Sequence, residues 1–274
     1  MSTSEQLSYP QYSIPDGTRV YAIGDIHGYL SPLQAMHLKI DMHLSDNPIE
    51  KTMIVYLGDY VDRGPESAAV VERLTLLSQE HSDIERVFIK GNHEWGMLGF
   101  LNSPLQFARP YLKWGGLEAL VSYGVDIPEH ITQDAIVEGS VLPAEYERLA
   151  SAYKEKVPVH HIKFLESLEL YRQVGGYLFV HAGIKPQVSL KNQKEQDLMR
   201  IREAFSDYEK AHEYRVVHGH QISTDVEIKS NRIGLDTGFY EQGVLSCVAL
   251  EKDNVEVLQV RQEVECRWTS PLKD

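Results

Sequence analysis

The most informative segment of this 274-residue chain is the run Leu57-Gly58-Asp59-Tyr60-Val61-Asp62-Arg63-Gly64. It follows the apolar residues 54–57, which have the composition of a β-strand, and it precedes an amphipathic pattern that Pro65 can open as a helix. Asp59 comes just after the strand, beside a glycine that lets a ligand approach closely, and this position suits a metal ion. Asp62 and Arg63 follow within one turn, so the loop can hold both a cation and an anion. Phosphate chemistry at a metal centre uses that combination.

The same arrangement occurs at two other places in the chain. An apolar run at 20–23 leads into Gly24-Asp25-Ile26-His27-Gly28, and another at 87–89 leads into Gly91-Asn92-His93-Glu94. Asp25 and His27 are alternate residues leaving a strand, so in an extended backbone their side chains point the same way. One such loop is compatible with an ordinary polar turn, but three in order, each after a predicted strand, indicate a functional site.

The three loops also predict a topology. Strands are expected at about 19–23, 53–57 and 86–90, with helical patterns between them. This β-α-β-α-β order indicates a mostly parallel sheet, and ligands of such sheets gather at the carboxyl ends of the strands. The three loops are therefore expected to meet at one edge of the sheet.

Composition limits the class of protein. A 42% apolar and 24% charged composition is typical of a soluble globular chain, and 274 residues suffice for one large domain. The net charge of −13, without clustered Lys and Arg, disfavours an extended nucleic-acid partner. No apolar run is long enough to cross a membrane, and residues 1–15 lack a signal-peptide pattern. Cys247 lies in an apolar run and is predicted to be a buried thiol. The buried thiol and the lack of a signal-peptide pattern together favour a cytoplasmic location.

The chain is predicted to contain a flexible arm at 1–17 and a single domain at 18–274. Within that domain, residues from about 97 to 168 carry helical patterns and no metal-type motif, and are expected to form a mainly helical insertion beside the site. Its His160-His161 pair is not expected to bind a metal, because adjacent residues of a helix do not share a face.

The pattern after residue 168 is mostly of the β type. Two short strands flank Gly175-Gly176 as in a hairpin, and the second strand leads directly into His181. A helix is expected at about 195–210 and a terminal hairpin at 244–260. Together with the first sheet, these strands indicate two sheets packed face to face with helices outside.

The three loops match residue for residue the GDxHG, GDxVDRG and GNHE motifs of the phosphoprotein phosphatase (PPP) branch of the metallophosphoesterases, which this chain therefore resembles. The resemblance continues more weakly through His181-Ala182-Gly183 and Gly219-His220-Gln221. The chain is similar in length and in its later loops to the bacterial and phage serine/threonine phosphatases of that branch. The resemblance implies an α/β fold, a metallophosphoesterase-like sandwich of two mixed β-sheets flanked by helices.

The resemblance also implies roles for individual residues. Two divalent metal ions, with Mn²⁺ expected and Fe²⁺ or Zn²⁺ as alternatives, would be held by Asp25, His27, Asp59, Asn92, His181 and His220. His93 would be the general acid, oriented by Asp62. Arg63 and Arg202 would bind phosphate, with Arg200 as the competitor of Arg202. The participation of His218 and Tyr240 stays open.

Three functions are weighed. The leading prediction is a phosphomonoesterase acting on phosphoserine and phosphothreonine of proteins, and also on phosphotyrosine, through attack of a metal-bridging hydroxide. The alternative is a symmetrical dinucleoside tetraphosphatase or an RNA 5′-pyrophosphatase, which carry the same motifs in the same order. The third is an inactive scaffold that binds phosphoproteins, disfavoured because every expected ligand is present. The sequence leaves the physiological substrate and the oligomeric state open.

Overall fold

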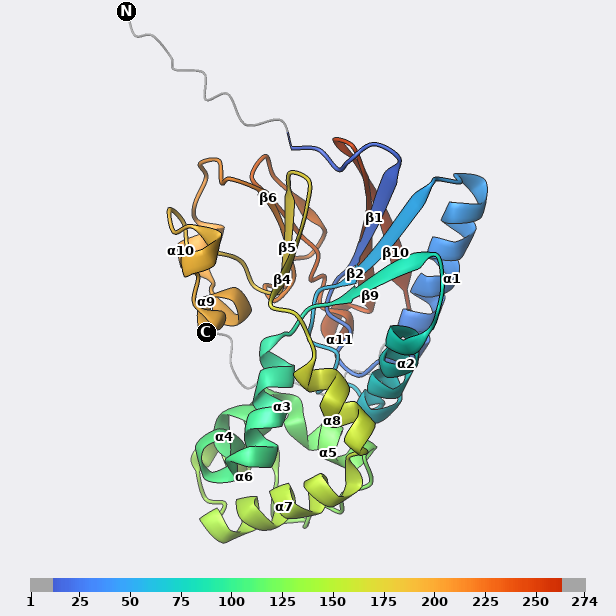
Figure 1. Cartoon of the computed structure of the whole chain (residues 1–274). Coiled ribbons are helices and arrows are strands. Elements are labelled where there is room, and N and C mark those ends of the chain that lie inside the picture. The colour runs from blue at the N-terminus through green and yellow to red at the C-terminus, as the bar shows by residue number, and fades with distance from the viewer. Residues whose placement is uncertain (1–11, 263–274) are drawn as a thin grey trace, which may run out of the picture.

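Two five-stranded β-sheets pack face to face in the computed structural model, which describes residues 12–262 (Figure 1). The first sheet has the strand order β10-β9-β1-β2-β3, with bounds Asn254–Arg261, Val244–Glu251, Thr18–Ile23, Lys51–Tyr56 and Ile84–Phe88. The second has the order β4-β5-β6-β8-β7, with bounds Tyr171–Val174, Tyr177–Val180, Arg215–His218, Arg232–Gly234 and Glu227–Ile228. Each sheet combines parallel and antiparallel pairs, so the predicted α/β sandwich of mixed sheets is confirmed.

The parallel core of the first sheet has the predicted β-α-β-α-β order. Strands β1, β2 and β3 pair in parallel and in sequence, which brings their carboxyl ends to one edge. The crossover helices are α1 (Leu30–Asp46) and α2 (Ser67–Gln79), which cover the outer face of this sheet (Figure 1). Both bury an apolar stripe, including Leu33 and Met36 in α1 and Val70 and Leu74 in α2. Burial of that stripe holds the carboxyl ends of the strands in place.

A helical lobe lies below the sheets in Figure 1 and corresponds to the predicted insertion. Its elements are α3 to α8 and one π-helical turn, with bounds Asn92–Asn102, Pro104–Tyr111, Leu112–Gly116 (the π-helical turn), Leu117–Ser122, Gln133–Glu138, Pro143–Lys156 and Val159–Glu166. The lobe begins with α3 at Asn92, within the third motif and a few residues before the predicted start at about 97.

The single helix predicted at 195–210 is wrong. The segment forms two short helices, α9 (Glu195–Arg200) and α10 (Glu203–Ser206). The break falls at Arg202, whose backbone (φ −130°, ψ −111°) is not helical. These helices lie on the outer face of the second sheet (Figure 1). The remaining elements are a 3₁₀ turn at Leu190–Asn192 and α11 at Phe239–Gln242, which carries Tyr240.

Residues 12–17 differ from the predicted flexible arm. Tyr12 and Ile14 are buried between the two sheets with Val20 and Phe179. The Ile14 N–H donates to the carbonyl of Lys252 at 2.8 Å, which ties this segment to the β9–β10 turn. Residues 1–11 lie outside the described part of the chain. Apolar side chains within an otherwise polar stretch, rather than its overall composition, explain the difference.

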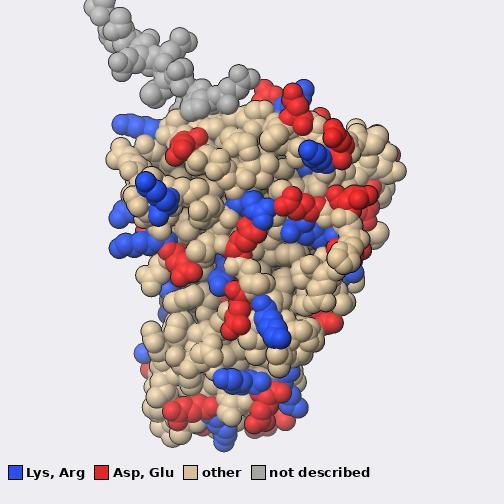
Figure 2. Space-filling model, in the orientation of Figure 1, with Lys and Arg blue, Asp and Glu red and all other residues tan. Residues whose placement is uncertain are grey.

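The described surface carries charges of both signs, and Cys247 lies in the core. On the face drawn in Figure 2, acidic and basic side chains are interspersed over both the sheets and the helical lobe. Within residues 12–262, none of the helices has the length and apolar character needed to cross a membrane. Cys247 is a buried free thiol, as predicted.

Candidate metal centre

The loops after β1, β2 and β3 converge, and Asp25, His27 and Asp59 are all buried there. Several residues of these loops and of the loop after β6 have a left-handed backbone, uncommon for residues other than glycine: His27, Asp59, Asp62, Arg63 and His220. Each costs of the order of 1–3 kcal/mol of strain, which the surrounding fold must offset. Such strain concentrates where side chains must be held in a fixed direction.

The first group of metal-type side chains consists of His27, Asp59 and His93. The Asp59 Oδ2 atom lies 3.7 Å from the Nε2 of His27 and 3.7 Å from the Nε2 of His93. One ligand atom from each residue lies within 4.8 Å of the other two. His27 and Asp59 were predicted as ligands, whereas His93 was predicted as the general acid.

The second group consists of Asp59, His181 and His220, all three predicted as ligands. The His181 Nε2 atom is 3.4 Å from the Asp59 Oδ2 and 3.0 Å from the Oδ1 of Asn92. Asp59 therefore belongs to both groups, as expected for a carboxylate shared by two cations. The structure brings the second sheet to the first at this point, because His181 follows β5 directly.

Asp25 stands beside the two groups rather than within either. Its Oδ2 accepts a hydrogen bond from the His220 N–H at 3.0 Å. Its Oδ1 and the Nε2 of His220 are buried and, within the described residues, have no hydrogen-bond partner. Glycine is required opposite, because a Cβ on Gly219 would lie 1.9 Å from the Asp25 Oδ1. Buried polar atoms left unpaired at a converging site are what a bound cation satisfies.

The imidazoles are oriented for ligation. Nδ1–H of His27 donates to the Val61 carbonyl at 3.1 Å and that of His181 to the Leu57 carbonyl at 2.8 Å, so the Nε2 of each is directed at Asp59. Burial lowers the pKa of His27 and of His220, which favours their neutral, ligating forms. Burial alone would raise the pKa of Asp59, but the neighbouring imidazoles outweigh it and hold this pKa well below its usual value. These residues fit divalent cations that prefer nitrogen and oxygen ligands.

His93 also makes a strong contact on its other side. Its Nδ1–H donates to the Asp62 Oδ2 at 2.7 Å, and both side chains are buried. Burial raises the pKa of Asp62, although the bond to His93 opposes the shift. This pair holds the His93 ring with its Nε2 at the cavity, which is the orientation that a general acid needs.

The cavity in front of the two groups has a volume of about 720 Å³, and residues from both sheets and from the insertion line it. The guanidinium carbon of Arg63 lies 4.0 Å from the ring centre of Tyr240. The backbone N–H of Arg63 donates to the carbonyl of Gly115 in the insertion at 3.0 Å, and this bond holds the Arg63 backbone in place. The guanidinium of Arg200 lies 4.9 Å from the ring of Trp114. Arg202 also lines the cavity. Both arginines therefore line the cavity, and the geometry does not choose between them.

The structure places Tyr240 and His218, whose participation in the site the sequence left open. Tyr240 lines the cavity, with its ring edge-on to His27 at 5.2 Å. His218 does not line it, and its ring instead packs edge-on against Phe205 at 5.0 Å. Five further residues that line the cavity had no role predicted from the sequence: Trp114, Glu203, Ile222, Asp236 and Glu241. Burial raises the pKa of Asp236 to about 6.

Glu94 was quoted in the third motif without a role, and the structure gives it one. Its carboxylate accepts the N–H groups of Asp59 (2.9 Å), Tyr60 (2.7 Å), Val61 (3.3 Å) and Gly91 (2.9 Å). The Glu94 carboxylate therefore links the backbone of the second loop to that of the third. The sequence signal for it is a glutamate three residues after the position that caps a helix, here Gly91 before α3.

Replacing Glu94 with Gln is expected to destabilise the whole domain. The amide offers one acceptor instead of two and turns its NH₂ group toward backbone donors, leaving about two buried N–H groups unpaired. At roughly 1–3 kcal/mol for each, the free energy of unfolding should fall by about 2–6 kcal/mol. Chemical denaturation of the metal-free protein measures this, with the exposed Glu213→Gln as control. Equal midpoints for the two variants would contradict the role assigned to Glu94.

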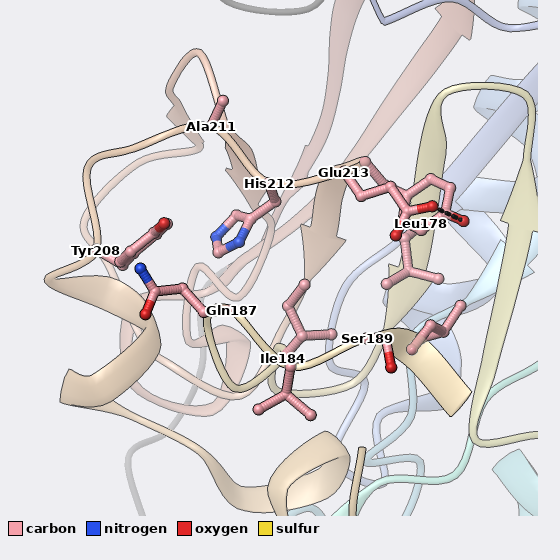
Figure 3. A pocket seen from close by; sticks show the side chains of 11 residues that line it. Leu178, Ile184, Gln187, Ser189, Tyr208, Ala211, His212 and Glu213 are labelled. Carbon is pink, nitrogen blue, oxygen red and sulfur yellow. Dashed lines mark hydrogen bonds between the residues drawn. The ribbon is translucent and has the colours of Figure 1, made fainter. Parts of the chain in front are cut away.

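A separate cavity of about 330 Å³ lies on the outer side of the second sheet (Figure 3). His212, Tyr208 and Gln187 lie on one side of it in Figure 3, and Ile184 and Leu178 also line it. None of the catalytic candidates lines it. It is therefore distinct from the metal centre.

Comparisons with known proteins identify the family and support the fold. A family model described as calcineurin-like phosphoesterase matches residues 18–257. The asymmetrical bis(5′-nucleosyl)-tetraphosphatase PrpE of Anoxybacillus flavithermus is 23% identical over 257 residues, which cover 87% of this chain and 92% of that protein. The PP2A-like serine/threonine phosphatase PPG1 of Saccharomyces cerevisiae is 27% identical over 128 residues, covering 45% of this chain and 31% of that protein. A solved structure assigned provisionally as a diadenosine tetraphosphatase superposes with a TM-score of 0.56 at 18% identity, over 90% of this chain and 95% of that one, and supports the fold.

Proposed function

The chain belongs to the calcineurin-like phosphoesterase family, and from this membership we propose that it is a metal-dependent hydrolase of dinucleoside polyphosphates of the bis(5′-nucleosyl) tetraphosphate type. The comparisons favour this alternative over the predicted protein phosphatase, because the tetraphosphatase likeness extends over 87% of the chain and the PP2A-like likeness over 45%. We further propose asymmetrical cleavage, the activity that the name of the PrpE relative from Anoxybacillus flavithermus describes, in place of the symmetrical cleavage weighed from the sequence.

The observation that supports a polyphosphate best is the number of arginines in the cavity. Arg63, Arg200 and Arg202 all line it, beside the two groups of metal-type residues. A phosphomonoesterase that resembles the PPP branch would use two arginines for its single phosphate, Arg63 and either Arg202 or Arg200. The third arginine is then available for a further phosphate of a polyphosphate chain. The aromatic rings of Trp114 and Tyr240, which also line the cavity, offer faces on which a nucleobase can stack.

The proposed chemistry assigns each residue a task. Two divalent cations held around Asp59, for which we propose Mn²⁺ with Fe²⁺ or Zn²⁺ as alternatives, would supply an acidified water and stabilise charge on the phosphoryl oxygens. Arg63 binds the phosphoryl oxygens in a bidentate manner. As the oxygen of water bonds to phosphorus, the bond from phosphorus to the leaving oxygen breaks. The proton at the His93 Nε2 is available to that leaving oxygen, and Asp62 keeps the ring in place.

Turnover by chelator-stripped protein, reloaded with Mn²⁺, tests the proposal. Diadenosine tetraphosphate and a phosphothreonine peptide are compared by kcat/KM, and the nucleotide products are separated by ion-exchange chromatography. We expect a preference of at least about tenfold for the dinucleotide, with ATP and AMP as products. Two equivalents of ADP would contradict asymmetrical cleavage, and preference for the peptide would contradict the substrate class.

One observation favours the phosphoprotein as second candidate. The buried Asp62–His93 pair, with its bond of 2.7 Å, is built to hold a proton for a leaving group. A serine or threonine alkoxide needs that proton far more than a nucleotide phosphate does, because the phosphate is a much weaker base. The peptide arm of the same experiment decides this point.

Replacing Arg63 with Ala is expected to weaken inhibition by inorganic phosphate about 10- to 100-fold, and to lower kcat/KM to a similar degree. A charge-assisted bond to a phosphate oxygen contributes roughly 1.5–3 kcal/mol, which corresponds to that range. The inhibition constant for phosphate, measured against p-nitrophenyl phosphate, checks this. Arg261→Ala on the exposed face of β10 is the matched control. Unchanged phosphate inhibition would remove Arg63 from the phosphate site.

A further inference from the structure

A third group of metal-type side chains lies away from the cavity, where α8 of the insertion packs against α2. Glu72 belongs to α2, and His160 and His161 belong to the first turn of α8; Figure 1 shows these two helices side by side. The Oε2 atom of Glu72 is 2.7 Å from the Nε2 of His160 and 2.6 Å from the Nε2 of His161. The three ligand atoms all lie within 4.8 Å of one another.

The prediction that the His160-His161 pair does not bind a metal did not include the carboxylate of Glu72. The prediction considered the helix alone, on which adjacent side chains diverge. Their rings do diverge, with planes at 79° and centres 4.6 Å apart. A carboxylate that reaches across from α2 lies between them, so both Nε2 atoms converge on one point. A ligand supplied by a second helix is what local spacing cannot reveal.

Two imidazole nitrogens and one carboxylate oxygen are a ligand set typical of Zn²⁺, which takes four ligands in a tetrahedron. The side chains of His160 and Glu72 are 51% and 45% exposed, so a water molecule can take the fourth position. Zinc bonds of about 2.0–2.1 Å would require the ligand atoms to separate by roughly 0.6 Å. Because His160 and Glu72 are exposed, their side chains can make that adjustment without disturbing the core.

His161 is prepared for this role from behind. Its side chain is only 4% exposed, and its Nδ1 lies 2.9 Å from the hydroxyl oxygen of Tyr123. When the Nδ1–H donates to that oxygen, the Nε2 carries the lone pair that a metal needs, and the ring is held in the required direction.

We propose that Glu72, His160 and His161 form a Zn²⁺ site, separate from the catalytic centre, that fastens the helical insertion to α2. The insertion supplies Trp114 to the substrate cavity, and the carbonyl of its Gly115 accepts the backbone N–H of Arg63. A cation bridging α8 and α2 therefore stabilises the lobe that forms one wall of that cavity. The proposal does not depend on which phosphoester the enzyme cleaves.

The test is the number of zinc ions bound by the full-length protein. Chelator-stripped protein is titrated with Zn²⁺ at pH 7.5, and bound metal is counted by mass spectrometry after desalting. We expect His160→Gln and Glu72→Gln each to bind one zinc ion fewer than the unmodified chain. His130→Gln is the matched control, because His130 pairs with Glu145 on the surface as a single histidine and a single carboxylate. It should retain the full number.

A second readout does not depend on catalytic activity. Zn²⁺ should raise the melting temperature of the unmodified chain more than that of His160→Gln, whereas Mn²⁺, which prefers more oxygen ligands, should raise both equally. Far-ultraviolet circular dichroism confirms that each variant is folded. Equal zinc stoichiometry in the unmodified chain and both variants would overturn the site and reduce the three residues to an ion pair. Equal melting shifts with Zn²⁺ would overturn its role in fastening the insertion.

Discussion

Replacing Asp59 with Asn is expected to lower kcat by about 10³-fold or more and to reduce the content of tightly bound catalytic metal. Asp59 is the one residue common to both catalytic groups, with its Oδ2 within 3.4–3.7 Å of three imidazole Nε2 atoms. An amide has no negative charge to share between two cations, so both are bound more weakly. Loss of metal-based charge stabilisation amounts to several kcal/mol of the activation barrier, and each 1.36 kcal/mol corresponds to a factor of ten.

Initial rates with p-nitrophenyl phosphate and metal analysis of the same preparation measure the two effects together. Asp253→Asn, in the exposed turn between β9 and β10, is the matched control and should behave as the unmodified chain does. The Asp59 variant must be shown to be folded, because its Oδ1 also accepts the His93 N–H at 3.1 Å. A folded variant that keeps its metal and its rate would exclude Asp59 as a shared ligand.

Replacing His93 with Ala is expected to lower the rate strongly for one kind of substrate only. For a phosphothreonine peptide, whose leaving alkoxide needs a proton, the loss should be about 10²- to 10⁴-fold, the range typical of a general acid. For p-nitrophenyl phosphate, whose leaving group is a weak base, it should be less than about tenfold. A dinucleoside polyphosphate should behave like the second substrate, since its leaving group is also a weak base.

Metal content separates the general-acid role of His93 from a ligand role. The Nε2 of His93 lies 3.7 Å from the Asp59 Oδ2, close enough for it to share a cation. We expect metal content to be unchanged in His93→Ala, as in the exposed control His130→Ala. Loss of metal together with equal losses on all substrates would show that His93 is a ligand. Asp62→Asn should reproduce the substrate pattern of His93→Ala more weakly, because it disturbs the orientation of the ring without removing it.

Much of the site follows from local sequence. Asp25, Asp59 and Asn92 each follow a short apolar run and a glycine, and the loops after parallel, consecutive strands end at the same edge of a sheet. That these residues lie close together could therefore be predicted without knowing any contact between distant parts of the chain. The glycines are explained equally locally, since a Cβ on Gly91 would lie 2.1 Å from the Asp59 Oδ1.

Other features of the site could not be predicted from local sequence, because packing brings together residues that are far apart in the chain. The divergent rings of His160 and His161 become a convergent pair only because Glu72 reaches them from α2. The helix α9 ends at Arg200 and the backbone is extended at Ile201, where the sequence pattern predicted that the helix would continue; Arg200 lies over the ring of Trp114. Such contacts depend on the angles between elements and on the reach of long side chains.

The sequence by itself determined the family, the two-sheet α/β fold and the residues that gather at the carboxyl ends of the first three strands. Its motifs are short, each lies within one loop, and strand periodicity places that loop. Only the tertiary structure decided how the insertion contributes to the cavity, which arginines line it, and that a carboxylate of α2 joins two histidines of α8. The physical reason is that these contacts link elements far apart in the chain, and their geometry is set by the packing of the core between them.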